Sequence, residues 1–189
     1  WNSRLMPGAK NRTLGLVGFG GIGTEVAKRA VPFGMKVIYF CRHPNLADDA
    51  AYGVQSVSME ELLKESDYVV AAVPLTDQTF HLFNEECIAQ MKAGSVLINI
   101  ARGPVVDEEA LAQALASGHL GGCAVDVFPK EPCTDSVLTR YSNALLTPHS
   151  ATSTAENSKA TNFAAANNLV NYLKKDIDAK YVVVQGTRY

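Results

Sequence analysis

The stretch TLGLVGFGGIG, residues 13–23, decides the fold. A short apolar run passes directly into a Gly-x-Gly-x-x-Gly pattern, and a helical pattern follows with Ile22, Val26 and Ala30 on one face, ended by Pro32 and Gly34. Glycines at this spacing allow a tight turn, a close approach of the backbone to a pyrophosphate, and close packing of helix on strand. The first N–H groups of the helix can then bind the phosphates. We therefore predict dinucleotide contacts from Gly18, Gly20, Gly21, Ile22 and Gly23.

The rest of the chain alternates apolar runs with helical patterns. Strands are predicted over residues 36–40, 54–57, 68–73, 95–100, 122–128 and 144–147. Helices are predicted after the capping box at Ser58, after Asp107, and from the caps Ser153 and Glu156 to about Lys174. Continuous apolar strands separated by helices predict an α/β fold, a doubly wound, Rossmann-like parallel sheet in a single domain. We place this domain at residues 1–175 and a C-terminal tail at residues 176–189.

Composition excludes several classes of partner. The chain has 189 residues, is 47% hydrophobic, and carries a net charge of −2. This charge gives no reason to expect binding to nucleic acid or to an acidic membrane surface. The cysteines form no Cys-x-x-Cys pair and suit small buried thiols in a reducing compartment, so we expect a cytoplasmic protein. No histidine or cysteine spacing suggests a metal site.

The end of the second predicted strand bears on the choice of nucleotide. An Asp or Glu there would hold the ribose 2′-hydroxyl of NAD, but Cys41 stands at that place, followed by Arg42 and His43. A guanidinium suits a 2′-phosphate. The sequence favours NADP over NAD as cofactor. The alternative, that Arg42 is a solvated surface residue and NAD binds without this contact, stays open.

Three polar residues follow apolar runs in the second half of the chain: Arg102, Glu131 and His149. Each by itself has a plain structural interpretation, as a surface arginine, a solvated loop acid and a turn residue. Together they form a carbonyl-reducing set. Arg102 would bind a carboxylate and a carbonyl oxygen, His149 would serve as general acid, and Glu131 would orient the imidazole.

The motifs at residues 17–23, 99–103, 124–128 and 147–149 resemble those of the D-isomer-specific 2-hydroxyacid dehydrogenases, over residues 1–173. The resemblance implies that Arg102, Glu131 and His149 are catalytic. It also implies cofactor contacts from Pro74 and Thr79 on the adenine and ribose side, from Ala101 and His149, and from Asp126 to the nicotinamide carboxamide.

The resemblance further implies hydride transfer between NAD or NADP and a small 2-hydroxy or 2-keto acid, and a homodimer. The family's substrate domain, built mostly from an N-terminal segment, has no counterpart here, so we expect the chain alone to turn over poorly. Two other functions stay open. One is a dinucleotide-sensing module of the corepressor type, and the other is a relative that oxidises a different hydride donor such as phosphite.

Overall fold

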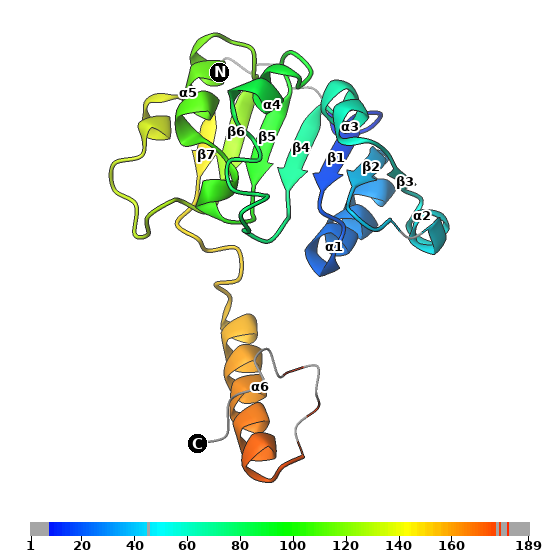
Figure 1. The fold of residues 1–189 in the computed structure, drawn as a ribbon, viewed down its shortest axis with the longest axis vertical. Helices are drawn as coiled ribbons and strands as arrows, with labels where there is room; N and C mark the ends of the chain where they lie inside the picture. Colours follow the sequence, from blue (N-terminus) through cyan, green and yellow to red (C-terminus); the bar gives the residue numbers. More distant parts are fainter. Residues whose placement is uncertain (1–7, 45, 177, 179–180, 182–189) are drawn as a thin grey trace, which may run out of the picture. The chain divides into compact units, whose positions relative to one another are not determined.

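A seven-stranded parallel sheet with the order β3-β2-β1-β4-β5-β6-β7 organises the first part of the chain (Figure 1). The computed structural model describes residues 8–44, 46–176, 178 and 181. It divides into two units, Trp1–His149 and Ser150–Tyr189, and each is described by itself. The strands are β1 Thr13–Val17, β2 Lys36–Phe40, β3 Gln55–Ser56, β4 Tyr68–Ala71, β5 Val96–Asn99, β6 Gly122–Val125 and β7 Ala144–Leu146.

Helices and short 3-10 turns connect these strands. The helices of the first unit are α1 Gly21–Ala30, α2 Leu46–Tyr52, α3 Met59–Glu65, α4 Glu85–Ala89 and α5 Glu108–Ala116. The 3-10 turns are Val31–Phe33, Gly103–Val105 and Val137–Arg140. Ser58 and Asp107 cap α3 and α5 by accepting backbone N–H bonds, as the sequence predicts.

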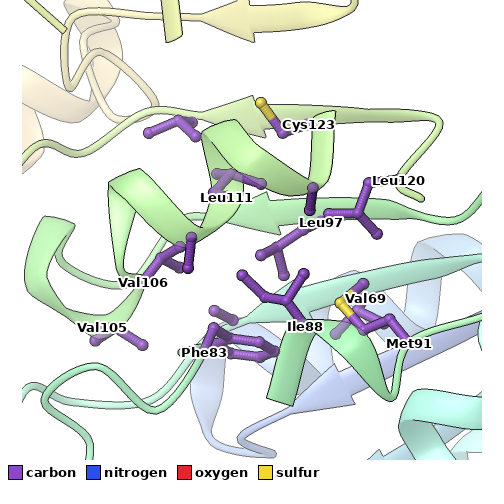
Figure 2. Packing of buried hydrophobic residues seen from close by; sticks show 14 of the residues in the cluster. Val69, Phe83, Ile88, Met91, Leu97, Val105, Val106, Leu111, Leu120 and Cys123 are labelled. Atoms are coloured by element: carbon purple, nitrogen blue, oxygen red, sulfur yellow. The ribbon is translucent and has the colours of Figure 1, made fainter. Parts of the chain in front are cut away.

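Alternation along the strands builds a core on each face of the sheet. In β1, Leu14 and Leu16 pack with Ala27 of α1, whereas Val17 points to the opposite face. On that opposite face, Figure 2 shows Leu97 of β5 beside Leu111 of α5 and Ile88 of α4, all almost fully buried. Helices therefore cover both faces, and the predicted doubly wound α/β fold is confirmed.

The strand order places a switch in direction at β1. This strand pairs with β2 on one side and with β4 on the other. The connections that leave the carboxyl ends of β1 and β4 therefore diverge, and they open a crevice where such folds bind ligands. The fingerprint glycines follow β1 directly and lie at this crevice.

Several local predictions differ from the structure. Ile22 does not pack into the core with Val26 and Ala30 but is 59% exposed at the start of α1. The segments after β4 and β6 leave the sheet at Ala71 and Val125, earlier than predicted, and form loops at the carboxyl edge. The short helices α2 and α4 are additional to the predicted elements. Of the cysteines, Cys123 is buried, whereas the others are half-buried.

The second unit is dominated by α6, Ala155–Leu173. Its N-cap is Thr154, whose side chain accepts the Asn157 N–H, and not Ser153 as predicted. The sequence groups this helix with the nucleotide-binding domain, and that grouping stays a prediction. Most of the predicted tail, residues 176–189, lies outside the described residues. Among the helices that the structure describes, none combines the length and apolar character needed to cross a membrane.

Candidate active site at the carboxyl edge of the sheet

Different local constraints explain why glycine occupies each position of the fingerprint. Gly18 has φ +102°, and a Cβ there would lie 2.5 Å from the Ala72 carbonyl oxygen. A Cβ at Gly23, buried within α1, would lie 2.6 Å from the Gly18 carbonyl oxygen. A Cβ at Gly20 would meet no atom within 4 Å. Protein packing thus explains the first and last glycines, whereas Gly20 leaves open space at the N-terminus of α1, as an approaching pyrophosphate requires.

A cavity of about 420 Å³ lies beside Gly20. The predicted cofactor residues among those that line it are Gly18, Gly20, Cys41, Arg42, His43, Pro74 and Thr79. Thr79 holds the wall after β4, because its hydroxyl donates to the Pro74 carbonyl at 2.6 Å and accepts the Thr76 N–H at 2.8 Å. No lining residue is an Asp or a Glu. Among the described residues, Arg42 takes part in no ion pair, so its guanidinium adds a positive charge to the lining of the cavity.

One carboxylate that follows the Cys41–His43 segment in sequence, that of Asp49, has partners outside this cavity. Asp49 of α2 accepts the Tyr39 hydroxyl at 2.7 Å and the Ser56 N–H at 3.2 Å. Burial and this contact raise the pKa of Tyr39 to about 12, so the phenol stays a donor. Tyr39 also stacks on Phe19 of the fingerprint, with ring centroids 4.0 Å apart. Asp49 is therefore held by protein donors and is not among the cavity's lining residues.

A second cavity, of about 450 Å³, lies at the ends of α1, β4 and β5. Its lining includes Ile22, Pro74, Ala101 and Arg102. The Arg102 Nη1 donates to the Ala101 carbonyl at 2.7 Å. Within the described residues no carboxylate forms an ion pair with Arg102, so its charge is available at the cavity. Ile22 is exposed because its side chain lines this cavity and does not pack into the core.

Glu131 and His149 meet at a third cavity, of about 570 Å³, lined also by Phe128 and Thr147. His149 Nδ1 lies 2.7 Å from Glu131 Oε2, and Glu131 Oε1 accepts the Phe128 N–H at 2.9 Å. These contacts, the His149 hydrogen bond first, lower the pKa of Glu131, and the charge of Arg102 contributes in the same direction. Arg102, Glu131 and His149 follow the adjacent strands β5, β6 and β7.

Asp126 directly follows β6 and is buried. Thr147, directly after β7, donates its hydroxyl to Asp126 Oδ1 at 2.5 Å. Sequence reasoning assigns no role to Thr147. Its register, with Thr147 N–H bonded to the Val125 carbonyl, brings it beside Asp126. Only the pairing of β6 with β7 reveals this contact.

Comparison with known proteins agrees with this geometry. Residues 1–151 match the model of a family described as D-isomer specific 2-hydroxyacid dehydrogenase, NAD binding domain. A glyoxylate reductase of Thermococcus litoralis is 41% identical over 175 residues, covering 93% of this chain and 53% of the relative. A hydroxypyruvate reductase of Thermotoga maritima is 43% identical over 161 residues, covering 82% and 52%. The chain spans about half the length of the curated relatives it matches.

Solved structures give the same result. A glyoxylate reductase from Paecilomyes thermophila superposes with a TM-score of 0.85 at 38% identity, covering 92% of this chain and 52% of that one. A D-lactate dehydrogenase from Aquifex aeolicus, complexed with NAD and lactic acid, superposes with a TM-score of 0.83 at 33% identity. That match covers 91% of this chain and 56% of that one.

Proposed function

The chain belongs to the D-isomer specific 2-hydroxyacid dehydrogenase family, as its NAD-binding domain, and we propose that it serves an enzyme that reduces a small 2-keto acid such as glyoxylate or hydroxypyruvate. The similar reductases support this choice of substrate. The observation that carries the proposal is the 2.7 Å pair of Glu131 and His149. These residues lie in the loops after β6 and β7, and β6 pairs with β5, which Arg102 follows.

The fit of the cofactor rests on the open space at Gly20, the cavity beside it, and the cavity at Arg102. The backbone N–H groups at the start of α1 would hold the pyrophosphate, and buried Asp126 would accept from the carboxamide. The bound nicotinamide supplies the hydride and, in the reverse direction, accepts it.

Side chains of this protein would bind the substrate carboxylate and transfer the proton. Arg102 would pair with the carboxylate of the acid and polarise its carbonyl. Glu131 engages Nδ1 of His149, which leaves Nε2 to exchange a proton with the substrate oxygen. In the reduction, hydride adds to the carbonyl carbon, the C=O π bond breaks, and the His149 proton goes to the oxygen, giving a 2-hydroxy acid. Oxidation reverses each transfer.

The test is steady-state reduction of glyoxylate and hydroxypyruvate by the intact protein, followed through loss of NADPH. His149→Gln should lower kcat by about 100- to 10,000-fold, the range of general acid catalysis. His119→Gln is the matched control, because His119 lies at the opposite end of the sheet and contacts the Ile88 carbonyl. Full activity of His149→Gln would exclude the acid role. Absence of any 2-keto acid reduction by the unaltered protein would exclude the proposed reaction.

The Arg42 guanidinium in the lining of the cavity also supports NADP as the preferred nucleotide. Arg42→Ala should weaken NADPH binding and leave NADH binding unchanged, measured by titration calorimetry. Cys41→Asp should shift selectivity in the same direction, toward NADH, because a carboxylate at the end of β2 accepts the 2′-hydroxyl of NADH and repels a 2′-phosphate. An unchanged ratio of NADPH to NADH affinity in both variants would refute this preference.

A further inference from the structure

Asn99 is the last residue of β5 and is only 1% exposed. Its side-chain amide and its backbone carbonyl both form hydrogen bonds with residues at the carboxyl edge of the sheet. Its Nδ2 donates to the Arg102 carbonyl at 3.1 Å, and its Oδ1 accepts the Ala101 N–H at 3.1 Å. Its own carbonyl accepts the Asp126 N–H at 3.1 Å. One buried residue thus contacts the backbone of three residues assigned to the site.

The contacts of Asn99 determine how the Arg102 turn leaves the strand. The Arg102 carbonyl also accepts the Val105 N–H at 3.0 Å, which closes the 3-10 turn after it. The Arg102 guanidinium donates in turn to the Ala101 carbonyl at 2.7 Å. The side chain of Arg102 therefore contacts the carbonyl of the Ala101–Arg102 peptide, and Asn99 binds the groups on either side of that peptide, the Ala101 N–H and the Arg102 carbonyl.

We propose that Asn99 is a positioning residue that holds the Ala101–Arg102 segment so that the guanidinium faces the carboxylate of the 2-keto acid; this inference rests on the proposed function. Position 99 requires an acceptor for the Ala101 N–H and a donor for the Arg102 carbonyl, and a side-chain amide supplies both. A carboxylate of the same shape would keep the bond to the Ala101 N–H. Its second oxygen would face the Arg102 carbonyl oxygen, and two acceptors repel each other.

The test is Asn99→Asp in the intact protein. Because small displacements of a positioning group can cost about 100-fold, kcat/KM for glyoxylate should fall by about 10- to 100-fold, mainly through a higher KM. The Kd for NADPH should stay unchanged, because aspartate keeps both the side-chain oxygen that accepts the Ala101 N–H and the backbone carbonyl that accepts the Asp126 N–H. The phosphate and 2′ sites lie on other strands. Asn143→Asp is the matched control, because its Nδ2 likewise donates to a backbone carbonyl, that of Gly121 at 3.2 Å, but at the amino end of β7.

Unchanged kcat and KM in Asn99→Asp would overturn the proposal. So would an equal loss of NADPH binding, which would mean a general structural role. If Asn99→Asp does not fold, the neutral Asn99→Ser is measured by the same readouts.

A separate readout covers failure of the proposed function. If the unaltered protein binds NADPH but reduces no 2-keto acid, the proposed function fails, and the Arg102 Nε–H resonance in NMR spectra still tests Asn99. The resonance should be single in the unaltered protein and shifted or broadened in Asn99→Asp. An identical resonance in both proteins would overturn the positioning role.

Discussion

Glu131 and His149 are 18 residues apart in sequence, yet Glu131 Oε2 lies 2.7 Å from His149 Nδ1. Both partners are held by the backbone around them. The Phe128 N–H donates to the other carboxylate oxygen, and His149 takes a left-handed conformation with φ +49°. The carboxylate therefore presents one oxygen to its own loop and the other to the imidazole. This arrangement orients the ring before any ligand binds.

The pair predicts an unusual acid titration of Glu131. Its pKa is lowered by the His149 hydrogen bond and then by the Phe128 N–H, so the carboxylate should stay ionised as pH falls below the ordinary glutamate value. A depressed pKa in the folded chain means that the pair is fully present above the ordinary value and is lost as pH falls through the lowered one. Carbon NMR of the Glu131 carboxyl checks this.

The variant His149→Phe supplies the control for this titration. Without the ring nitrogen the midpoint of Glu131 should move up toward that of a free glutamate, while the Phe128 contact persists. A midpoint in the unaltered chain at or above the ordinary value would contradict the observed pairing.

Gly103 should be intolerant of any side chain. A Cβ at this position would lie 2.0 Å from the Phe128 carbonyl carbon and 2.2 Å from the Pro129 nitrogen. Gly103→Ala would therefore separate the loop of Arg102 from the loop of Glu131. Forcing atoms into a packed site costs about 1–3 kcal/mol or more, which urea denaturation would measure. Gly8→Ala, where an added Cβ meets no atom within 4 Å, should cause no comparable loss.

Alanine substitutions at two fingerprint glycines should affect different properties, cofactor binding at Gly20 and stability at Gly23. Gly20→Ala should fold with unchanged stability but bind NADPH about tenfold more weakly or worse, a loss of about 1.4 kcal/mol, because the methyl group enters the space left for the pyrophosphate. Gly23→Ala should lose stability, since its Cβ would press on the Gly18 carbonyl oxygen. Thermal unfolding and calorimetric titration separate the two losses. Equal effects of both substitutions on stability would contradict the division of roles.

Thr147→Val should weaken cofactor binding through Asp126. The substitution keeps the shape of the side chain but removes the hydroxyl that donates to Asp126 Oδ1. A hydrogen bond to a charged group is worth about 1.5–3 kcal/mol. We therefore expect a loss of this order in the free energy of unfolding and the free energy of NADPH binding taken together. Thr147→Ser should restore most of it. A valine variant with unchanged stability and unchanged Kd would show that the contact does not orient Asp126.

Local patterns were sufficient for the fold class. The apolar run before Gly18, the β-branched strand after Gly34, and the caps Ser58 and Asp107 each depend on neighbours in sequence, and the structure confirms the elements they predict. The helix α2 was missed because its pattern is weak. The residues of the site were also named from their types and order, since Arg102, Glu131 and His149 each follow an apolar run.

The sequence by itself therefore determined the doubly wound sheet, its glycine turn, and the identity of the candidate site residues. Only the tertiary structure decided which atoms meet. The contact of Thr147 with Asp126 depends on the pairing of β6 with β7 and on its register. The contact of Asp49 with Tyr39 depends on where α2 lies beside β2. The bonds of Asn99 to the Arg102 turn depend on how the chain leaves β5. Spacing along a chain encodes the face on which a side chain lies, but contacts between elements arise from packing across the sheet.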